Sequence, residues 1–170
     1  MNAMMTTEGE QRRIDATREW LDKVRKTVTY AAWLEESAEV QFSRADGLKA
    51  INPENGKVRK SPYADAIPDA VAAHQDAGEA LKAIAASARD QIGEAAGAIA
   101  KMDDKTEATC LQLYYIDAYD TWERVCVAMH YSYDGMMKLS RRALLHAYDV
   151  MPHYRKDPPS HATPEMPLPE

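Results

Sequence analysis

Side chains that can bind nucleic acid recur at helical spacing in the last third of the sequence. Lysine and arginine side chains in this stretch suit phosphate oxygens or guanine, whereas tyrosine, aspartate and methionine can contact base edges. We expect them to share the outward face of one helix that begins after Ser132. The predicted DNA-binding residues are Tyr133, Asp134, Met137, Lys138, Arg141 and Arg142.

Two short helices separated by the three residues "HYS" would position this face. Thr121 and Ser132 are good helix-capping residues, and a helical pattern of apolar residues follows each of them. Cys126 supplies a small side chain where the two helices meet. The other residues expected to face inward are Val125, Met129, Met136, Leu139, Ala143 and Leu144.

A third helix is predicted directly before this pair. The acidic residues of "DDKTE" at 103–107 favour a helix start, and the helix is expected to run to about Ile116. The three helices together predict a helix-turn-helix module over 103–154, whose last helix would enter a major groove.

Two long upstream segments predict an antiparallel, coiled-coil-like helical hairpin over 11–102. In each segment, apolar or small residues recur every three or four positions, and a loop at 47–67 contains glycine and proline. Glu35 is the one residue out of place, and Gly93 and Gly97 are expected to allow close helix packing. The first seam is Ile14, Thr17, Leu21, Val24, Val28, Ala31, Glu35, Ala38, Phe42 and Ala45; the second is Val71, His74, Gly78, Leu81, Ala85, Ala88, Ile92, Ala95, Ile99 and Met102.

The predicted fold is therefore all-α, with unstructured ends. Residues 1–10 are expected to be a flexible N-terminus, and 155–170, which hold five prolines, a disordered tail. No apolar run is long enough to span a bilayer, and the first residues lack the apolar core of a signal peptide, so we expect a cytoplasmic protein without membrane contact.

Charge and residue types exclude several classes of function. The net charge of −6 argues against indiscriminate nucleic-acid binding, so phosphate contacts must come from a local basic patch. Residues 102–134 hold seven acidic and two basic residues, whereas 135–156 hold five basic residues and one acidic residue. Neither paired carboxylates suited to catalysis nor a phosphate-binding glycine loop is found, so we expect no enzyme, no catalytic residue and no cofactor.

The cysteines and histidines raise one alternative. Cys126 and His130 are four residues apart and could hold a metal together with two ligands from Cys110, His146 or His153. We favour small, reduced core cysteines and an ordinary turn histidine, and therefore predict neither a metal nor a disulfide.

The stretch from Tyr114 to Met151 resembles the C-terminal module of small phage regulators of the ArpU and RinA type, which is similar to region four of bacterial sigma factors. The resemblance covers most of 10–152, with specific motifs in the last forty residues. It implies a phage- or prophage-encoded transcription regulator that binds double-stranded DNA in a bacterial host cell. The matching residues are Tyr115, Ile116, Thr121, Trp122, Val125, Met129, Tyr131, Ser132, Met136, Leu139, Ala143 and Leu144.

Three departures from the family pattern keep a second hypothesis open. Arg124 replaces the usual acid, His130 the usual turn glycine, and Asp134-Gly135 the usual polar or basic residues. In the alternative, the same shape belongs to an inhibitor or adaptor that binds a host protein, such as RNA polymerase or a defence nuclease like a CRISPR effector. In either case we expect a homo-oligomer, a dimer formed through the Ala-rich hairpin.

Overall fold

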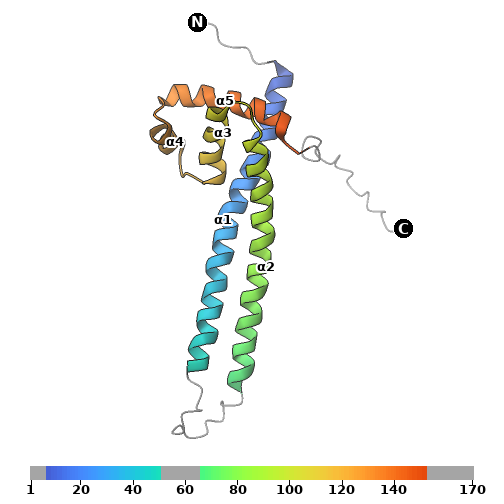
Figure 1. Ribbon diagram of the computed structural model, residues 1–170, viewed down its shortest axis with the longest axis vertical. Helices are drawn as coiled ribbons and strands as arrows, with labels where there is room; N and C mark the ends of the chain where they lie inside the picture. Colours follow the sequence, from blue (N-terminus) through green and yellow to red (C-terminus); the bar gives the residue numbers. More distant parts are fainter. Residues whose placement is uncertain (1–6, 51–65, 153–170) are drawn as a thin grey trace, which may run out of the picture. The chain divides into compact units, whose positions relative to one another are not determined.

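The computed structural model describes residues 7–50 and 66–152, and these residues confirm the all-α prediction (Figure 1). They form helices and short connections, without a strand among them. None of the helices in these ranges is long and apolar enough to cross a membrane. The predicted tail at 155–170 lies outside the described residues, as does most of the predicted loop.

The chain divides into two compact units. The first, which we call the helix-pair unit, comprises residues 22–96 and 115–118. The second, which we call the α3–α5 module, contains the described residues 7–21, 97–114 and 119–152. Each unit is built on its own set of contacts.

Helices α1 (Glu8–Ala50) and α2 (Ile67–Ala100) supply the helix-pair unit (Figure 1). Arg89 donates two hydrogen bonds to Glu35, at 2.8 and 2.7 Å, so the one charged residue of the first seam has a partner on α2. Further along, Glu39 pairs with Lys82. As the residue number increases along α1, from 35 to 39, the residue number of the partner on α2 decreases, from 89 to 82. The two helices therefore run antiparallel in this unit.

Small side chains fill the space between the two helices. Ala31, Ala88 and Ile92 form a buried cluster, against which Val28 and Ile116 pack. Every position of both predicted seams in this unit is buried or half-buried. The seams are thus covered within one chain, whereas alanines of α2 outside the seam, such as Ala73, Ala80 and Ala83, are exposed.

The predicted role of two glycines is wrong. A methyl group added at Gly93 or Gly97 would meet no atom within 4 Å, so neither marks a close approach of helices in the part of the chain that the structure describes. Gly78 does, because a methyl group there would lie 2.7 Å from the ring of Phe42. The spacing of four residues singled out Gly93 and Gly97 in the sequence. Whether a glycine is crowded depends instead on which side chain of α1 lies beside it, as Phe42 lies beside Gly78.

Both ends of α1 also differ from the predicted boundaries. The helix continues through Gly47 to Ala50, because one glycine weakens a helix by only about 1 kcal/mol and no proline intervenes. It begins at Glu8, inside the segment expected to be flexible. The Thr7 hydroxyl accepts a hydrogen bond from the Glu10 N–H, and the Glu10 carboxylate accepts one from the Thr7 N–H. This reciprocal pair is a capping box, which stabilises the first turn.

The α3–α5 module contains three further helices, α3 (Lys105–Leu111), α4 (Trp122–Met129) and α5 (Tyr133–Val150). The predicted single helix to Ile116 instead ends as a π-helical turn, η3 (Gln112–Ile116). α5 packs against both α3 and α4. The buried side chains between them are Cys110, Val125, Cys126, Met136 and Leu139.

Helix caps confirm where these helices were expected to start. The Asp104 carboxylate accepts hydrogen bonds from the N–H groups of Thr106 and Glu107. Thr121 accepts from the Arg124 N–H, and Ser132 from the Gly135 N–H at 3.2 Å. Each cap satisfies an N–H group that the first turn of a helix leaves without a partner.

Candidate nucleic-acid interface

The turn between α4 and α5 sets the start of the candidate recognition helix. His130 ends α4 in the left-handed conformation, with φ 58° and ψ 42°. The Tyr131 N–H then donates to the Cys126 carbonyl at 3.0 Å, which closes the end of α4 before Ser132 caps α5. A glycine usually occupies such a position because a Cβ atom is unfavourable there. The chain therefore makes the tight turn despite the histidine.

The outward face of α5 carries three of the predicted contact residues. Asp134, Lys138 and Arg141 are exposed and are spaced four and three residues apart, so they lie along one side of the helix. Lys138 has no hydrogen-bonding or ion-pair partner among the residues that the structure describes. Tyr133, in the first turn, is 50% exposed.

Met137 is placed differently from the prediction. It is half-buried and packs against the hydrophobic cluster between α3, α4 and α5. Only a part of its side chain is therefore accessible, and its contribution is mainly to the core. The remaining predicted base contacts are the two side chains at the start of α5, Tyr133 and Asp134.

Arg142 is engaged by carboxylates within the chain. Glu107, on α3, is only 1% exposed, and Arg142 donates from Nε to its Oε1 atom. His146 Nδ1 lies 2.6 Å from the other oxygen, Oε2. Asp104 Oδ2 is 3.7 Å from the Arg142 guanidinium. Two carboxylates thus lie beside this guanidinium and compensate part of its positive charge, although 57% of the side chain is exposed.

The pKa values of two members of this cluster, Arg142 and Asp104, are shifted. The hydrogen bond from Arg142 to Glu107 raises the pKa of the arginine above its usual value. The pKa of Asp104 is lowered, chiefly because its carboxylate accepts the backbone hydrogen bond from Glu107 and also because Arg142 and His146 are nearby. The ionised forms of Arg142 and Asp104 are thus favoured, and the cluster fastens α5 to the start of α3.

From Arg141 onward, α5 is also in contact with the first turns of α1. Arg141 Nη2 donates to the side-chain oxygen of Gln11 at 2.9 Å. The Arg13 guanidinium lies over the Tyr148 ring, 4.7 Å from its centroid, and pairs with Asp149. The residues of α5 before Arg141 take no part in these contacts, and the Arg141 side chain, at the boundary, is hydrogen-bonded to Gln11 but exposed.

Both cysteines are free and buried in the core. Cys110 Sγ lies 3.5 Å from Met136 Sδ, and burial raises the pKa of its thiol to about 12. Burial also raises the pKa of Cys126. Within the ranges that the structure covers, no three His, Cys, Asp or Glu side chains gather closely enough to hold a metal ion; His153 lies outside them.

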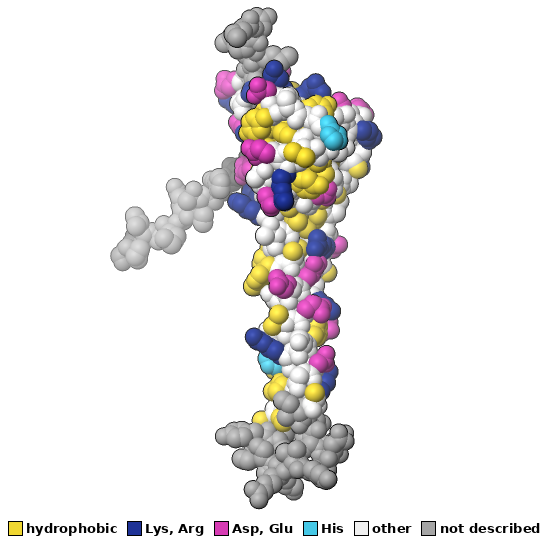
Figure 2. Space-filling model, turned by 90° about the vertical axis from the view of Figure 1, so that its left-hand side faces the viewer, with side chains coloured by type: hydrophobic (Ala, Val, Ile, Leu, Met, Phe, Trp, Pro, Cys, Tyr) yellow, Lys and Arg dark blue, Asp and Glu magenta, His cyan; other side chains and the backbone are white. Residues whose placement is uncertain are grey.

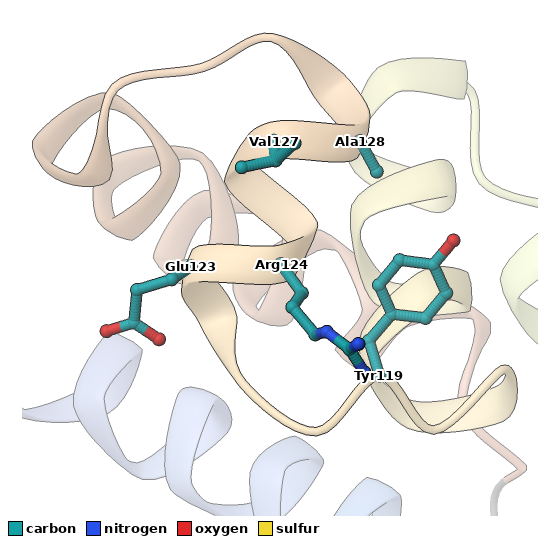
Figure 3. Close-up of a pocket in the computed structure, with 5 residues that line it drawn as sticks. All are labelled: Tyr119, Glu123, Arg124, Val127 and Ala128. Carbon is teal, nitrogen blue, oxygen red and sulfur yellow. The ribbon is translucent and has the colours of Figure 1, made fainter.

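A surface hollow of about 560 Å³ lies beside α4 (Figure 3). Tyr119, Arg124, Val127 and Ala128 line it, together with Glu123, whose carboxylate is directed away from the Tyr119 ring. Val127 is 75% exposed, although it is a large apolar residue. Arg124 pairs with Asp120 at 2.7 Å, so the hollow presents mainly an apolar surface.

Comparison with protein-family models, with curated proteins and with solved structures finds no match for this chain. The assignment of a function therefore rests on the residues described above. The sequence analysis did not predict that Glu107 contacts both Arg142 and His146. It identified Glu107 only as an acidic residue in the first turn of a helix. The available signal was a pair of basic side chains four residues apart on α5, Arg142 and His146, which can hold one carboxylate between them.

Proposed function

We propose that this protein is a DNA-binding transcription regulator that inserts the first half of α5 into a major groove. The observation that carries the proposal is the exposed line of Asp134, Lys138 and Arg141 on a helix that follows a three-residue turn after α4. A recognition helix of this type contacts base edges through its first residues. The resemblance to phage regulators and to sigma-factor region four supports the same assignment.

The proposed contacts are of two kinds, contacts with phosphates and contacts with base edges. Lys138 and Arg141 would bind phosphates, and Tyr133 and Asp134 would contact base edges, where a carboxylate accepts a hydrogen bond from the amino group of cytosine. We omit Arg142 from the phosphate contacts because it is paired with Glu107 and Asp104. Two phosphate contacts predict a slope of about −2 for log affinity against log salt concentration.

The test starts from a selection of bound duplexes from a random DNA library with the full chain. The affinity for a selected duplex is then measured by fluorescence anisotropy at several salt concentrations. The double variant Lys138→Gln/Arg141→Gln should lose most of the salt dependence on every sequence. The control Arg44→Gln/Lys49→Gln changes the net charge equally on exposed residues of α1 and should bind like the wild type.

Tyr133→Ala and Asp134→Ala test readout separately. Each should change the sequence that is recovered in the selection and leave the salt slope unchanged, because neither side chain contacts a phosphate in the proposal. If no duplex is retained even at low salt, or if the Lys138/Arg141 variant and its control bind equally, the DNA-binding proposal is wrong.

A second candidate is a protein-binding inhibitor or adaptor, with a host protein such as RNA polymerase as its target. The exposed Val127 and the apolar hollow beside α4 favour it. Titration of the chain with purified bacterial RNA polymerase tests this candidate. Val127→Asp should abolish the complex and Lys138→Gln/Arg141→Gln should preserve it, whereas a DNA regulator that acts alone should show no complex with either.

A further inference from the structure

An aromatic pair on α1 lies on the face of the helix that is turned away from α2. Tyr30 and Trp33 stack with their ring centroids 5.9 Å apart and an interplanar angle of 16°. They are 49% and 54% exposed, although their neighbours Ala31 and Leu34 are buried. Val40, seven residues after Trp33 and therefore on the same side of the helix, is 44% exposed.

Large apolar side chains in this number are unusual on one exposed helix face. A tyrosine or tryptophan buries about 150–250 Å² when it is fully covered, so half-exposed rings leave a considerable apolar area in water. Figure 2 shows hydrophobic side chains reaching the surface of the helix pair between acidic and basic ones. A pattern of this kind is typical of a face that packs against another helix.

Two unpaired charges flank the aromatic pair. Lys26 lies four residues before Tyr30, and Glu36 lies three residues after Trp33. Both are exposed, and neither has a hydrogen-bonding or ion-pair partner in the described ranges 7–50 and 66–152. Each is within reach of a second helix laid across the aromatic residues, because long charged side chains border such contacts.

We propose that this face of α1 binds the same face of a second copy of the chain, with the two α1 helices antiparallel. A two-fold axis between Tyr30 and Trp33 would place the aromatic pairs against each other. At 1.5 Å per residue, it would bring Lys26 of one copy to within about 1.5 Å, along the helix axis, of the level of Glu36 of the other. The symmetry forms this ion pair twice, whereas parallel helices would set like charges opposite each other.

The occupant is a second copy because the face is complementary to itself. The apolar anchors alone cover less than the roughly 800 Å² per partner of a standard interface, so we expect a reversible dimer that dissociates on dilution. The proposal concerns the helix-pair unit and does not depend on DNA binding by α5. It also differs from a dimer through the alanine seams, which are covered by the chain itself.

Sedimentation velocity of the full chain over a wide concentration range tests the dimer. The wild type should pass from monomer to dimer, and Tyr30→Ala/Trp33→Ala should remain a monomer at every concentration. Both residues are half exposed, so the variant should keep its helix content, measured by circular dichroism. Tyr131→Ala/Tyr133→Ala is the matched control, since it removes two exposed aromatic residues elsewhere and should dimerise normally.

Charge reversal tests the antiparallel arrangement. Lys26→Glu should raise the dissociation constant by about threefold to tenfold, because the substitution removes both of the symmetry-related exposed ion pairs. The swap Lys26→Glu/Glu36→Lys should restore the wild-type value. A wild type that stays monomeric, an aromatic variant that dimerises like the wild type, or a swap that fails to restore the affinity overturns the proposal.

Discussion

The buried clusters of the helix-pair unit and of the α3–α5 module differ in the size of their side chains. Alanines and a single isoleucine form the cluster between α1 and α2, whereas methionine, leucine, valine and cysteine fill the module. Their charges differ as well: Glu35 and Arg89 bridge the helix pair in contact with solvent, but Glu107 is withdrawn from solvent in the module. We therefore expect the stability of the helix pair to respond to larger buried side chains and to changes in helix propensity at exposed positions. We expect the stability of the module to respond to smaller buried side chains and to the loss of a buried charge.

The largest effect is expected from Met136→Ala in the module. Met136 is fully buried, so truncation leaves a cavity and should lower the free energy of unfolding by about 3 kcal/mol. Amide hydrogen exchange in α5 measures the loss locally. Val127→Ala is the control, because the side chain is exposed and its truncation should change stability by less than about 0.5 kcal/mol. Equal effects of the two substitutions would contradict the assigned core.

Glu107→Gln should have the next largest effect. The substitution keeps the volume but removes the charge that Arg142 and His146 share, and we expect a loss of about 2 kcal/mol in the free energy of unfolding of the module. Arg89→Gln breaks the exposed pair with Glu35 and should lower the free energy of unfolding by less, because solvent screens this pair. Urea denaturation of both variants measures the difference, and a larger loss for Arg89→Gln would reverse the comparison.

Ala31→Leu tests the opposite sensitivity of the helix pair. Ala31 is fully buried beside Ala88 and Ile92, so three additional carbon atoms must separate the helices, at a cost of about 2 kcal/mol. The neighbouring Ala32 is exposed, and Ala32→Leu should be close to neutral. Hydrogen exchange in residues 22–50 of α1 distinguishes the two variants. Similar protection in both would show that the space between the helices can expand.

The smallest predicted change is a gain. Gly93 is exposed and has open space around its Cα atom, so Gly93→Ala should stabilise α2 by about 1 kcal/mol through helix propensity alone. Gly78→Ala has the same intrinsic advantage, but the ring of Phe42 must move to accept the methyl group. Thermal unfolding should therefore rank Gly93→Ala above Gly78→Ala, and the reverse order would restore a packing role for Gly93.

The sequence predicted the features that depend on local periodicity. The seam positions, the caps at Thr121 and Ser132 and the all-α class follow from spacing and from side-chain chemistry within one turn. It did not predict that Arg142 is held by Glu107, because 35 residues separate the two and no local pattern records the pairing. The roles of Gly78 and Gly93 were missed for the same reason, since both depend on what the other helix places nearby.

The candidate site was predictable to a similar degree. Helical spacing correctly indicated that Asp134, Lys138 and Arg141 share the outward side of α5. Helical spacing could not show that Arg142 is paired with a buried carboxylate, whereas Arg141 is hydrogen-bonded to Gln11, because both residues are exposed positions on the same helix. For Met137, the width of the buried side of α5 was underestimated, since α3 and α4 cover it from two directions.

The stack between Tyr114 and Trp122 gives the module an optical signature of its own. The rings are 3.9 Å apart at their centroids and nearly parallel, at 12°, and they adjoin the hydrophobic cluster of the module. The other two tryptophans, Trp20 and Trp33, lie on α1. With both replaced by phenylalanine, the fluorescence of the remaining indole would report whether η3 and α4 stay together. The chain thus contains a native chromophore with which ligand binding near α4 can be followed without a label.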